Sequence, residues 1–153
     1  MNVQIREATL ADVEPFVVLG KIMHEETAFA DITWDNERVM RFGKLAVTHD
    51  DFCVFVAEAD GASVGMVIAQ IVPFYFSAER RLCDHLWYVA EEYRGGPVAA
   101  QLIEKLIEFA KLNKVKEIYS GVSTGVNTDK THDLLTKLNY QHLGGLYKYK
   151  VQG

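Results

Sequence analysis

Apolar residues follow two different periods along the chain, and each period predicts one kind of element. Alternating or continuous apolar residues, rich in Val, Ile, Phe and Tyr, predict strands over residues 3–8, 52–59, 63–72, 82–90, 117–122 and 140–151. Apolar residues recurring every three or four positions predict helices from Asp12 through Met23, over 36–46, from Val98 through Lys111 and over 127–138. The predicted order is strand, two helices, three strands, helix, strand, helix, strand.

Local signals indicate how several of these elements begin and connect. Thr9-Leu10-Ala11-Asp12 matches a capping box ahead of the first helix, and Pro15 then falls in its first turn, where a missing N–H costs little. Asp60-Gly61 predicts the turn of an antiparallel hairpin. Gly144-Gly145 predicts a bulge or bend in the last strand. With one strand–helix–strand crossover near its middle, the whole chain, 1–153, is expected to form one α/β domain with a mixed sheet.

Composition narrows the class of protein. The chain has 153 residues, 49% of them hydrophobic, which is enough for a substantial core and excludes a disordered chain. Eleven Gly and three Pro exclude a collagen-like or low-complexity sequence. The formal net charge of -5 argues against a nucleic-acid binder, which normally carries a basic surface.

Cysteines and apolar runs bear on the compartment. Cys53 and Cys83 both lie in apolar stretches, which argues against a disulfide scaffold and favours a cytoplasmic setting. The N-terminus lacks the apolar core of a signal peptide, and the most apolar stretch, 64–76, is too short to span a bilayer. We therefore expect no membrane partner. Cys83-Asp84-His85 is the one cluster of metal-ligating residues, and neighbours on a strand point to opposite faces, so no metal site is expected.

The segment between the predicted strand 82–90 and the helix from Val98 carries the clearest chemistry. Its sequence is Glu91-Glu92-Tyr93-Arg94-Gly95-Gly96-Pro97. Glycines let backbone amides approach a ligand, and a helix start offers free N–H groups to a phosphate. The alternative is a plain strand-to-helix turn with Arg94 solvated. A dinucleotide site fits poorly, because Gly-x-Gly-x-x-Gly is absent.

The order of elements and four short motifs resemble the GNAT superfamily of acyl-CoA-dependent N-acetyltransferases. The motifs are Ile5-Arg6-Glu7-Ala8-Thr9 with Asp12, residues 56–61 with Val64-Gly65, residues 87–96, and Leu138-Asn139-Tyr140. The resemblance covers most of the chain. It implies a fold whose central strand, 82–89, splays from strand 117–122, with the pantetheine arm of acetyl-CoA in the gap.

The same resemblance implies where the co-substrate, acetyl-CoA or CoA, would bind. The implied cofactor-binding residues are Trp87, Tyr88, Val89, Arg94, Gly95, Gly96, Val98, Ala99, Ala100 and Asn127. Two positions depart from the family pattern. Pro97 stands where the family's Gln/Arg-x-x-Gly-x-Gly/Ala signature has its first Gly, so one amide donor is lost, although Pro favours a helix start. Leu135 stands where the family often has the Tyr that protonates the departing thiolate.

Acyl transfer to an amine needs a group that removes a proton from the amine. The candidate catalytic residues are Asp84, His85 and Tyr147, with Glu79 as a further alternative base. Asp84 is the first choice for the base, and the alternative reading of Asp84 is a solvated or capping carboxylate. The alternative reading of His85 is a packed core imidazole. For the missing acid, Tyr140, Tyr147 or bound water could serve, or CoA could leave as a thiolate, while tyrosines in a terminal strand also commonly serve packing.

Charge is divided along the chain. Residues 1–92 hold 7 Lys and Arg against 16 Asp and Glu, whereas residues 93–153 hold 9 against 5. A basic part suits anionic CoA, and an acidic lip with Glu25, Glu26 and Trp34 would suit a cationic amine such as a polyamine, Lys or an amino sugar. The alternative is an ordinary solvated acidic loop.

Three functions compete on this sequence. The first is an N-acetyltransferase acting on a small cationic or peptide amine, and a homodimer is a further expectation. The second is a non-catalytic CoA-binding or regulatory domain of the same fold, which Pro97 and Leu135 favour. The third is an interaction module that uses the aromatic run Pro73-Phe74-Tyr75-Phe76, a run that could equally form a dimer interface in an enzyme.

Overall fold

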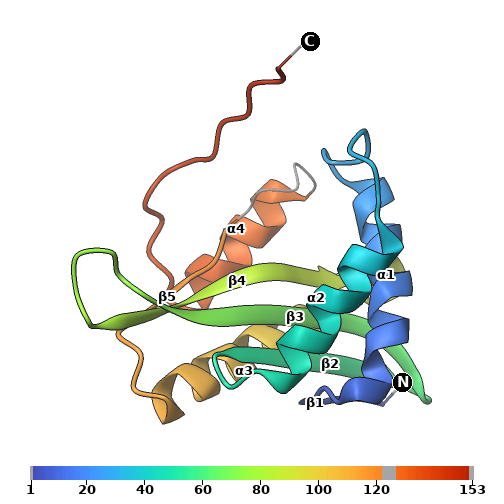
Figure 1. Cartoon of the computed structure of the whole chain (residues 1–153), viewed down its shortest axis with the longest axis horizontal. Helices are drawn as coiled ribbons and strands as arrows, with labels where there is room; N and C mark the ends of the chain where they lie inside the picture. Colours follow the sequence, from blue (N-terminus) through green and yellow to red (C-terminus); the bar gives the residue numbers. More distant parts are fainter. Residues whose placement is uncertain (1, 122–126, 152–153) are drawn as a thin grey trace.

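A computed structural model describes residues 2–121 and 127–151 of the chain (Figure 1). The strands are β1 (Val3–Glu7), β2 (Phe52–Ala59), β3 (Ala62–Pro73), β4 (Arg80–Val89) and β5 (Glu117–Tyr119). The helices are α1 (Val13–Glu26), α2 (Asn36–Thr48), α3 (Val98–Leu112) and α4 (Thr128–Lys137), with short 3-10 turns at Leu10–Asp12 and Glu91–Tyr93. The expected mixed α/β class is confirmed.

The five strands form one sheet in the order β1-β2-β3-β4-β5. The first three pairings are antiparallel and β4 pairs with β5 in parallel, across the crossover through α3. The β2–β3 hairpin turns at Asp60 and Gly61, with φ of 51° and 81°, a pair of positive values that the tight turn of a right-twisted hairpin requires. The turn lies where the Asp-Gly pair predicts it.

Helices cover the sheet on both faces. α1 and α2 lie on one face and α3 on the other (Figure 1). Along β3, Met66 and Ile68 pack toward α1 and α2, while Val67 and Ala69 pack toward α3. A central strand buried on both faces reads as a continuous apolar run, which is why β3 is nearly all hydrophobic.

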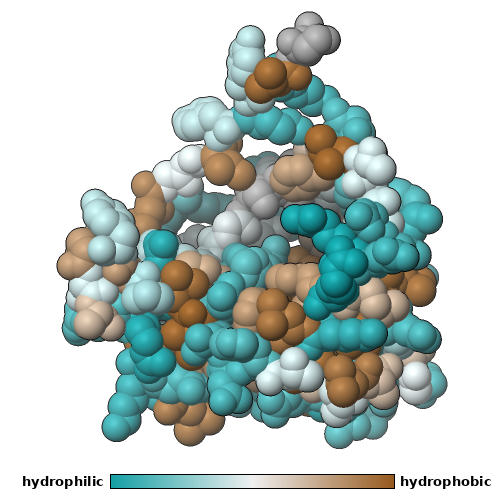
Figure 2. Space-filling model, in the orientation of Figure 1, coloured by the Kyte–Doolittle hydropathy of each residue, from teal (hydrophilic) through white to brown (hydrophobic). Residues whose placement is uncertain are grey.

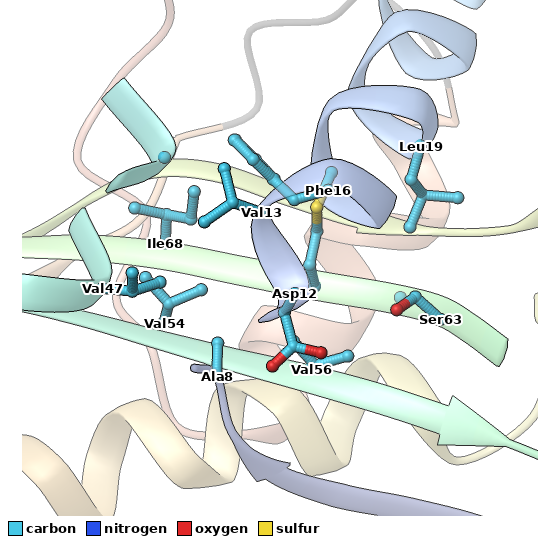
Figure 3. A pocket seen from close by; sticks show the side chains of 13 residues that line it. Ala8, Asp12, Val13, Phe16, Leu19, Val47, Val54, Val56, Ser63 and Ile68 are labelled. Carbon is cyan, nitrogen blue, oxygen red and sulfur yellow. The ribbon is translucent and has the colours of Figure 1, made fainter. Parts of the chain in front are cut away.

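The core beneath α1 and α2 is tightly filled. The side chains of Phe16, Val54 and Ile68 are among those that line a void of about 10 Å³ (Figure 3). A void of that size is about one water molecule's worth of space, so this part of the core is no ligand site.

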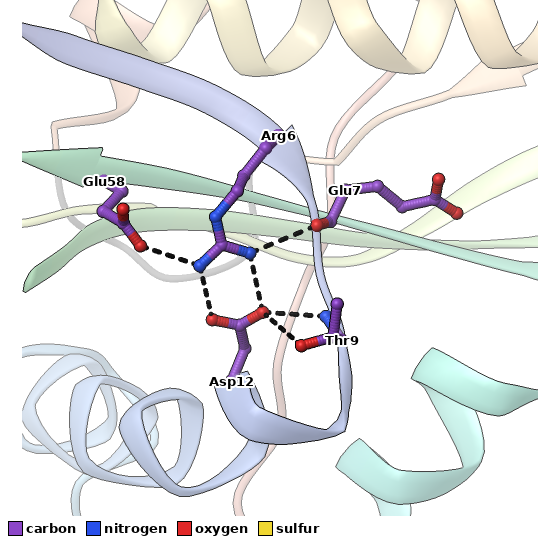
Figure 4. A network of polar contacts seen from close by, with 5 residues as sticks. All are labelled: Arg6, Glu7, Thr9, Asp12 and Glu58. Carbon is purple, nitrogen blue, oxygen red and sulfur yellow. Dashed lines mark hydrogen bonds and ion pairs between the residues drawn. The ribbon is translucent and has the colours of Figure 1, made fainter. Parts of the chain in front are cut away.

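A polar network fixes the passage from β1 into α1. Arg6 forms paired hydrogen bonds of 2.8 Å to the two carboxylate oxygens of Asp12, and a further bond of 2.7 Å to Glu58 on β2 (Figure 4). The Asp12 carboxylate also accepts from the Thr9 backbone N–H at 2.7 Å, and the predicted capping box is present. The hydrogen bonds from Arg6 lower the pKa of Asp12, although burial opposes them.

The end of the chain departs from the prediction. The strand expected over 140–151 is wrong: within the described residues the chain after Tyr140 carries no strand and is exposed. β5 is shorter than expected, ending at Tyr119, and Val122 lies outside the described residues. A strand needs a hydrogen-bonded neighbour, and none is present beyond β5 in that part of the chain.

The remaining helix predictions need smaller corrections. In α4 Leu135 is buried, whereas Leu134 and Leu138 are half-buried instead of fully inward. α3 begins at Val98, as predicted, and Pro97 is the residue just before it. Across the described ranges, no helix is both long enough and apolar enough to cross a membrane.

Candidate functional site

β4 and β5 part after a short common stretch. Their parallel register joins Arg81–Cys83 to Glu117–Tyr119 and ends there, while β4 continues to Val89. From Asp84 onward, no described strand pairs with that edge of β4. Its backbone N–H and C=O groups are therefore available to an extended ligand.

A cleft of about 770 Å³ opens beside the free part of β4. It lies between the ends of α1 and β4, the start of α3 and the helix α4. Eight of the residues that the family resemblance assigns to CoA line it: Trp87, Tyr88, Val89, Arg94, Gly95, Gly96, Ala99 and Asn127. The other two, Val98 and Ala100, do not line it; Val98 is buried in the core beneath.

The loop before α3 presents backbone amides to this cleft. Gly95 has a φ of 83°, a conformation that side-chain-bearing residues rarely adopt. Pro97 lies just ahead of the helix, and its carbonyl accepts the first helical bond from Gln101 at 3.0 Å. The amides of the first turn have no acceptor within the helix and can meet an anion there.

Arg94 is already engaged by a carboxylate. Its Nη2 lies 2.7 Å from Oε2 of Glu26 at the end of α1, and its Nε donates to the Val89 carbonyl at 2.8 Å. The Tyr88 hydroxyl donates to the same Glu26 carboxylate at 3.1 Å, and the guanidinium lies 5.2 Å from the Tyr88 ring centre. Burial, followed by the Glu26 charge, raises the pKa of Tyr88.

An acid–base cluster lies where β4 and β5 separate. Asp84 Oδ1 accepts a hydrogen bond from the Gly121 backbone N–H at 3.3 Å, and the Ser120 side chain also bonds the carboxylate. Ser120 Oγ in turn lies 3.4 Å from the Tyr140 hydroxyl. Burial raises the pKa of Asp84 to about 6, with the Gly121 and Ser120 bonds opposing the rise, and burial also raises the pKa of Tyr140.

The structure separates the other candidate catalytic residues from this cluster. His85 is the extra residue of a β-bulge, because Ile68 pairs with Leu86 and the next residue, Ala69, with Asp84. Its Nε2 lies 2.8 Å from Gln70 Oε1 and its ring stacks on Phe52. Burial lowers the pKa of His85. This placement matches the packed-imidazole alternative.

Tyr147 and Glu79 lie elsewhere. Tyr147 lies on the C-terminal segment, and its side chain is 94% exposed to solvent. Glu79 lies 3.6 Å from Lys116 Nζ in an exposed ion pair. Neither joins the Asp84 cluster in this chain.

The residues predicted to bind the acceptor do not all lie in the cleft. Glu26 lines the cleft, whereas Glu25 beside it is exposed and does not. Trp34 packs against Gly20 and the His24 ring, and its Nε1 donates to Asn36 Oδ1 at 2.8 Å. Trp34 therefore packs against α1 and stabilises the connection between α1 and α2.

Sequence reasoning missed two sets of residues. Ser120 and Gly121 contact Asp84 from just beyond β5, and nothing in their local sequence indicates this long-range contact. Lys130 and Lys137 line the cleft from α4. Their spacing of two helical turns places them on one face of a helix, and that is the signal that could have found them.

Metal ligands do not gather among the residues that the structure describes: no group of three or more His, Cys, Asp or Glu could hold an ion there. Both cysteines are free. Burial raises the pKa of the Cys53 thiol to about 12, so this thiol is unreactive at neutral pH.

Comparisons with known proteins agree with this geometry. Residues 19–140 match the sequence model of the acetyltransferase (GNAT) family. A protein of Archaeoglobus fulgidus named as an uncharacterized N-acetyltransferase is 30% identical over 122 residues, covering 77% of this chain and 82% of that protein.

Solved structures share the whole fold. AAC(6')-Iy in complex with a bisubstrate analogue, CoA-S-monomethyl-acetylneamine, superposes with a TM-score of 0.80 at 18% identity, over 100% of both chains. An aminoglycoside acetyltransferase from an uncultured soil metagenomic sample, solved with sisomicin, gives 0.73 at 16% identity, over 98% of this chain and 97% of the other.

Proposed function

Since this chain belongs to the acetyltransferase (GNAT) family, we propose that it transfers the acetyl group of acetyl-CoA directly to a primary amine of a small cationic or peptide acceptor. The observation that carries the proposal is the separation of β4 from β5, which leaves the outer edge of β4 beyond Cys83 without a described strand partner, beside a cleft of about 770 Å³. One wall of this cleft is the start of α3 with its free amides.

The cleft fits the parts of CoA. The first-turn amides of α3, Arg94 and the α4 lysines Lys130 and Lys137 supply donors and positive charge for the diphosphate. The free backbone of β4 supplies donors and acceptors for the amide-bearing pantetheine arm. Trp87, which lines the cleft, has an indole N–H that is buried and finds no acceptor among the described residues, so an acceptor from a ligand would satisfy it.

Asp84 is our proposed base. With a pKa of about 6, its carboxyl is mostly ionised at neutral pH and can still take a proton from the acceptor ammonium, directly or through the Ser120 hydroxyl or water. The neutral amine nitrogen then attacks the thioester carbonyl and a C–N bond forms; the nitrogen gives up its extra proton to water, and the C–S bond breaks. The CoA sulfur takes the electron pair as it leaves.

The protonation of that sulfur needs a different donor from the usual one, because Leu135 is buried at the family's Tyr position. Tyr140 is the tyrosine whose hydroxyl bonds into the Asp84–Ser120 cluster. We therefore propose Tyr140 as the acid in preference to bound water, and bound water in preference to Tyr147.

The acceptor is expected to be cationic. Glu26 lies in the cleft wall, and Asp31 and Asp35 lie in the connection after α1. Carboxylates at this lip attract ammonium groups. The fold neighbours named as aminoglycoside acetyltransferases act on acceptors of this charge class, which makes amino sugars and polyamines the first panel to try.

Melting curves with and without acetyl-CoA test the cofactor half of the proposal. A ligand at 100 times its Kd stabilises a protein by about 2.7 kcal/mol, so a clear rise in Tm is expected. Arg94→Ala should reduce the rise, and Arg38→Ala, an exposed α2 arginine, should not. No rise at millimolar acetyl-CoA would contradict CoA binding altogether.

Thiol release across a panel of amines tests the chemical half. We expect release with at least one polyamine or amino sugar, and loss of release in Asp84→Asn. A rise in Tm without thiol release for any amine would favour the non-catalytic alternative. A cytoplasmic location, supported by the two free cysteines, and a homodimer also belong to our proposal.

A further inference from the structure

A second pocket lies at the end of β4 that is remote from the cleft. It opens beside the connection between β3 and β4, which projects from one end of the sheet (Figure 1). In the same orientation, Figure 2 shows apolar side chains among hydrophilic ones at this end. The pocket has a volume of about 390 Å³ and shares no lining residue with the cleft. We call it the tip pocket, and it is lined by Phe74, Tyr75, Phe76, Glu79, Arg81, Lys116, Glu117 and Tyr119.

Arg81 brings an unpartnered guanidinium to the tip pocket. Its central carbon lies 5.4 Å from the ring centre of Phe74 and 5.1 Å from that of Tyr119, so the side chain packs against two aromatic rings. Its Nε is buried and finds no hydrogen-bond acceptor among the described residues. A buried donor without an acceptor is unfavourable, and an acceptor brought by a ligand would remove this cost.

The carboxylates that line the tip pocket do not supply that acceptor. Glu79 is engaged by Lys116, whose Nζ lies 3.6 Å from its Oε1, and both side chains are well exposed. Glu117 is opposite Arg81 in the register of β4 and β5, yet it is exposed and forms no ion pair with Arg81. The positive charge of Arg81 is therefore unpaired within the part of the chain that the structure describes.

The chemistry of the lining residues selects one class of ligand. The planar fork of an arginine binds a carboxylate through two parallel hydrogen bonds, and an arginine stacked on aromatic rings is held in position to do so. The side chains of Tyr75 and Phe76 are 100% and 72% exposed, so they leave apolar surface in water that a ligand would cover. Apolar walls around one charged group are typical of small-molecule sites.

We propose that the tip pocket binds a small carboxylic acid that carries an aromatic ring. The carboxylate accepts hydrogen bonds from Arg81, and the ring packs against Phe74 and Phe76. From Arg81 to Trp87 the strand rises by roughly 20 Å, so this ligand does not compete with a co-substrate in the cleft. The site is additional to the proposed acetyl transfer and does not rest on it.

A ligand in the tip pocket would join the two strands whose separation forms the cleft. The pocket takes Arg81 from β4 and Tyr119 from β5, and these strands pair over three residues each. A molecule in contact with both would stabilise this short ladder. The chain after Tyr119 continues into Ser120, whose side chain bonds Asp84. Occupancy of the tip pocket should therefore steady the acid–base cluster and slow amide hydrogen exchange in β5.

NMR titration of the ¹⁵N-labelled full chain tests the ligand class. The probe is 3-phenylpropionate, and its matched control is the neutral amide 3-phenylpropanamide. We expect saturable shifts at residues 74–81 and 116–119, with a Kd of roughly 1 mM or tighter. The amide should bind at least tenfold more weakly. Equal binding of acid and amide, or no saturable shift at these residues, would overturn the proposal.

Variants test the role of Arg81. Arg81→Gln should weaken binding of 3-phenylpropionate at least tenfold. Arg80→Gln is the matched control, because Arg80 is exposed, does not line the tip pocket and donates to the Asn113 carbonyl at 2.6 Å. An equal loss in both variants would show that only net charge matters and would overturn the site. Phe76→Ala changes an exposed ring, so the fold should be kept, and binding should still weaken.

Amide hydrogen exchange tests the effect on β5. Saturating 3-phenylpropionate should slow exchange at Glu117–Tyr119 and leave β1 unchanged. Unchanged exchange in β5 would contradict a ligand that joins the two strands. Shifts at residues 74–76 that follow protein concentration and not the probe would assign the pocket to contacts between copies, and would overturn the proposal. These measurements contain no acetyl-CoA, so a failure of the proposed acetyl transfer would not affect them.

Discussion

Glu26 Oε2 lies 2.7 Å from Arg94 Nη2, so a carboxylate from α1 occupies the guanidinium that faces the start of α3. The two side chains come from positions far apart in the sequence and meet in the cleft wall. Before CoA binds, the Glu26 carboxylate holds the position beside Arg94 that the CoA diphosphate would take. An incoming diphosphate must share Arg94 with this carboxylate or displace it.

Glu26→Gln should therefore tighten CoA binding. Arg94 and Glu26 are each about a third exposed, and such pairs contribute at most about 1 kcal/mol, which corresponds to roughly a fivefold change in Kd. Titration calorimetry with CoA would measure it. Glu25→Gln is the matched control, since it removes the same charge from the neighbouring, exposed position. An equal gain in both variants would show that only net charge matters.

Activity should rise with pH around the pKa of Asp84. The carboxyl must be ionised to accept a proton, so kcat/KM should increase through about pH 6. Asp84→Asn should lower kcat by roughly 10²–10⁴-fold and remove this limb of the profile. Glu79→Gln, at an exposed carboxyl outside the cluster, should leave the profile unchanged. A profile that keeps its limb in Asp84→Asn would assign the base to another group.

The same residue predicts a pH dependence of stability. The folded pKa of Asp84 is raised from 3.8 to about 6, so its neutral form favours folding below pH 4 and this contribution is lost as pH rises through 6. Asp84→Asn should then stabilise the protein at pH 8 relative to wild type, by up to about 3 kcal/mol. Urea unfolding at pH 4 and pH 8 would measure it. An equal effect at both pH values would contradict the burial of this charge.

Asp12 should show the opposite dependence. Its folded pKa is lowered by Arg6, so its contribution is present above pH 4 and is lost as pH falls below that value. Asp12→Asn should destabilise the protein by roughly 1–3 kcal/mol at pH 7, because Arg6 then loses its charged partner. Urea unfolding of this variant beside Asp129→Asn, an exposed helix carboxyl, would isolate the effect. The difference between the two should shrink at pH 3.

Pro97→Gly tests whether the departure from the family signature matters. The substitution restores one backbone N–H at the start of α3, so CoA affinity should stay the same or become tighter. Stability should fall by roughly 0.4–1 kcal/mol, since the unfolded chain gains freedom. Pro73→Gly, at the exposed end of β3, should lower stability without changing affinity. A large loss of CoA affinity in Pro97→Gly would mean that the rigid loop itself binds the co-substrate.

Local signals were sufficient for most of the fold. The Asp-Gly turn, the capping box at Thr9 and the apolar periods place β2, β3, α1 and α3 within a few residues of where they lie. The bulge at His85 was not predicted, because an extra residue in one strand changes the pairing with a distant strand and leaves no local pattern.

The sequence did not reveal which residues contact the candidate site residues, because these contacts join segments that are far apart in the chain. Arg94 and Asp84 were identified as candidates, but their partners Glu26, Ser120 and Gly121 come from other elements. The apolar alternation of residues 140–151 predicts a strand, and this prediction is wrong, because the described chain carries no strand after Tyr140. A strand also needs a neighbour, and nothing in one chain's sequence says where that neighbour comes from.

The short pairing of β4 with β5 has a consequence for the order of folding. β1 to β4 are joined by sequential antiparallel pairings and packed helices, so they can form early, whereas β5 and α4 wait for a parallel crossover with only a few ladder residues. Leu135 is the buried residue of α4, and Leu134 and Leu138 beside it are half-buried. A ligand held between α3 and α4 would stabilise α4 against local unfolding. Protease resistance of the C-terminal third should therefore rise when acetyl-CoA is present.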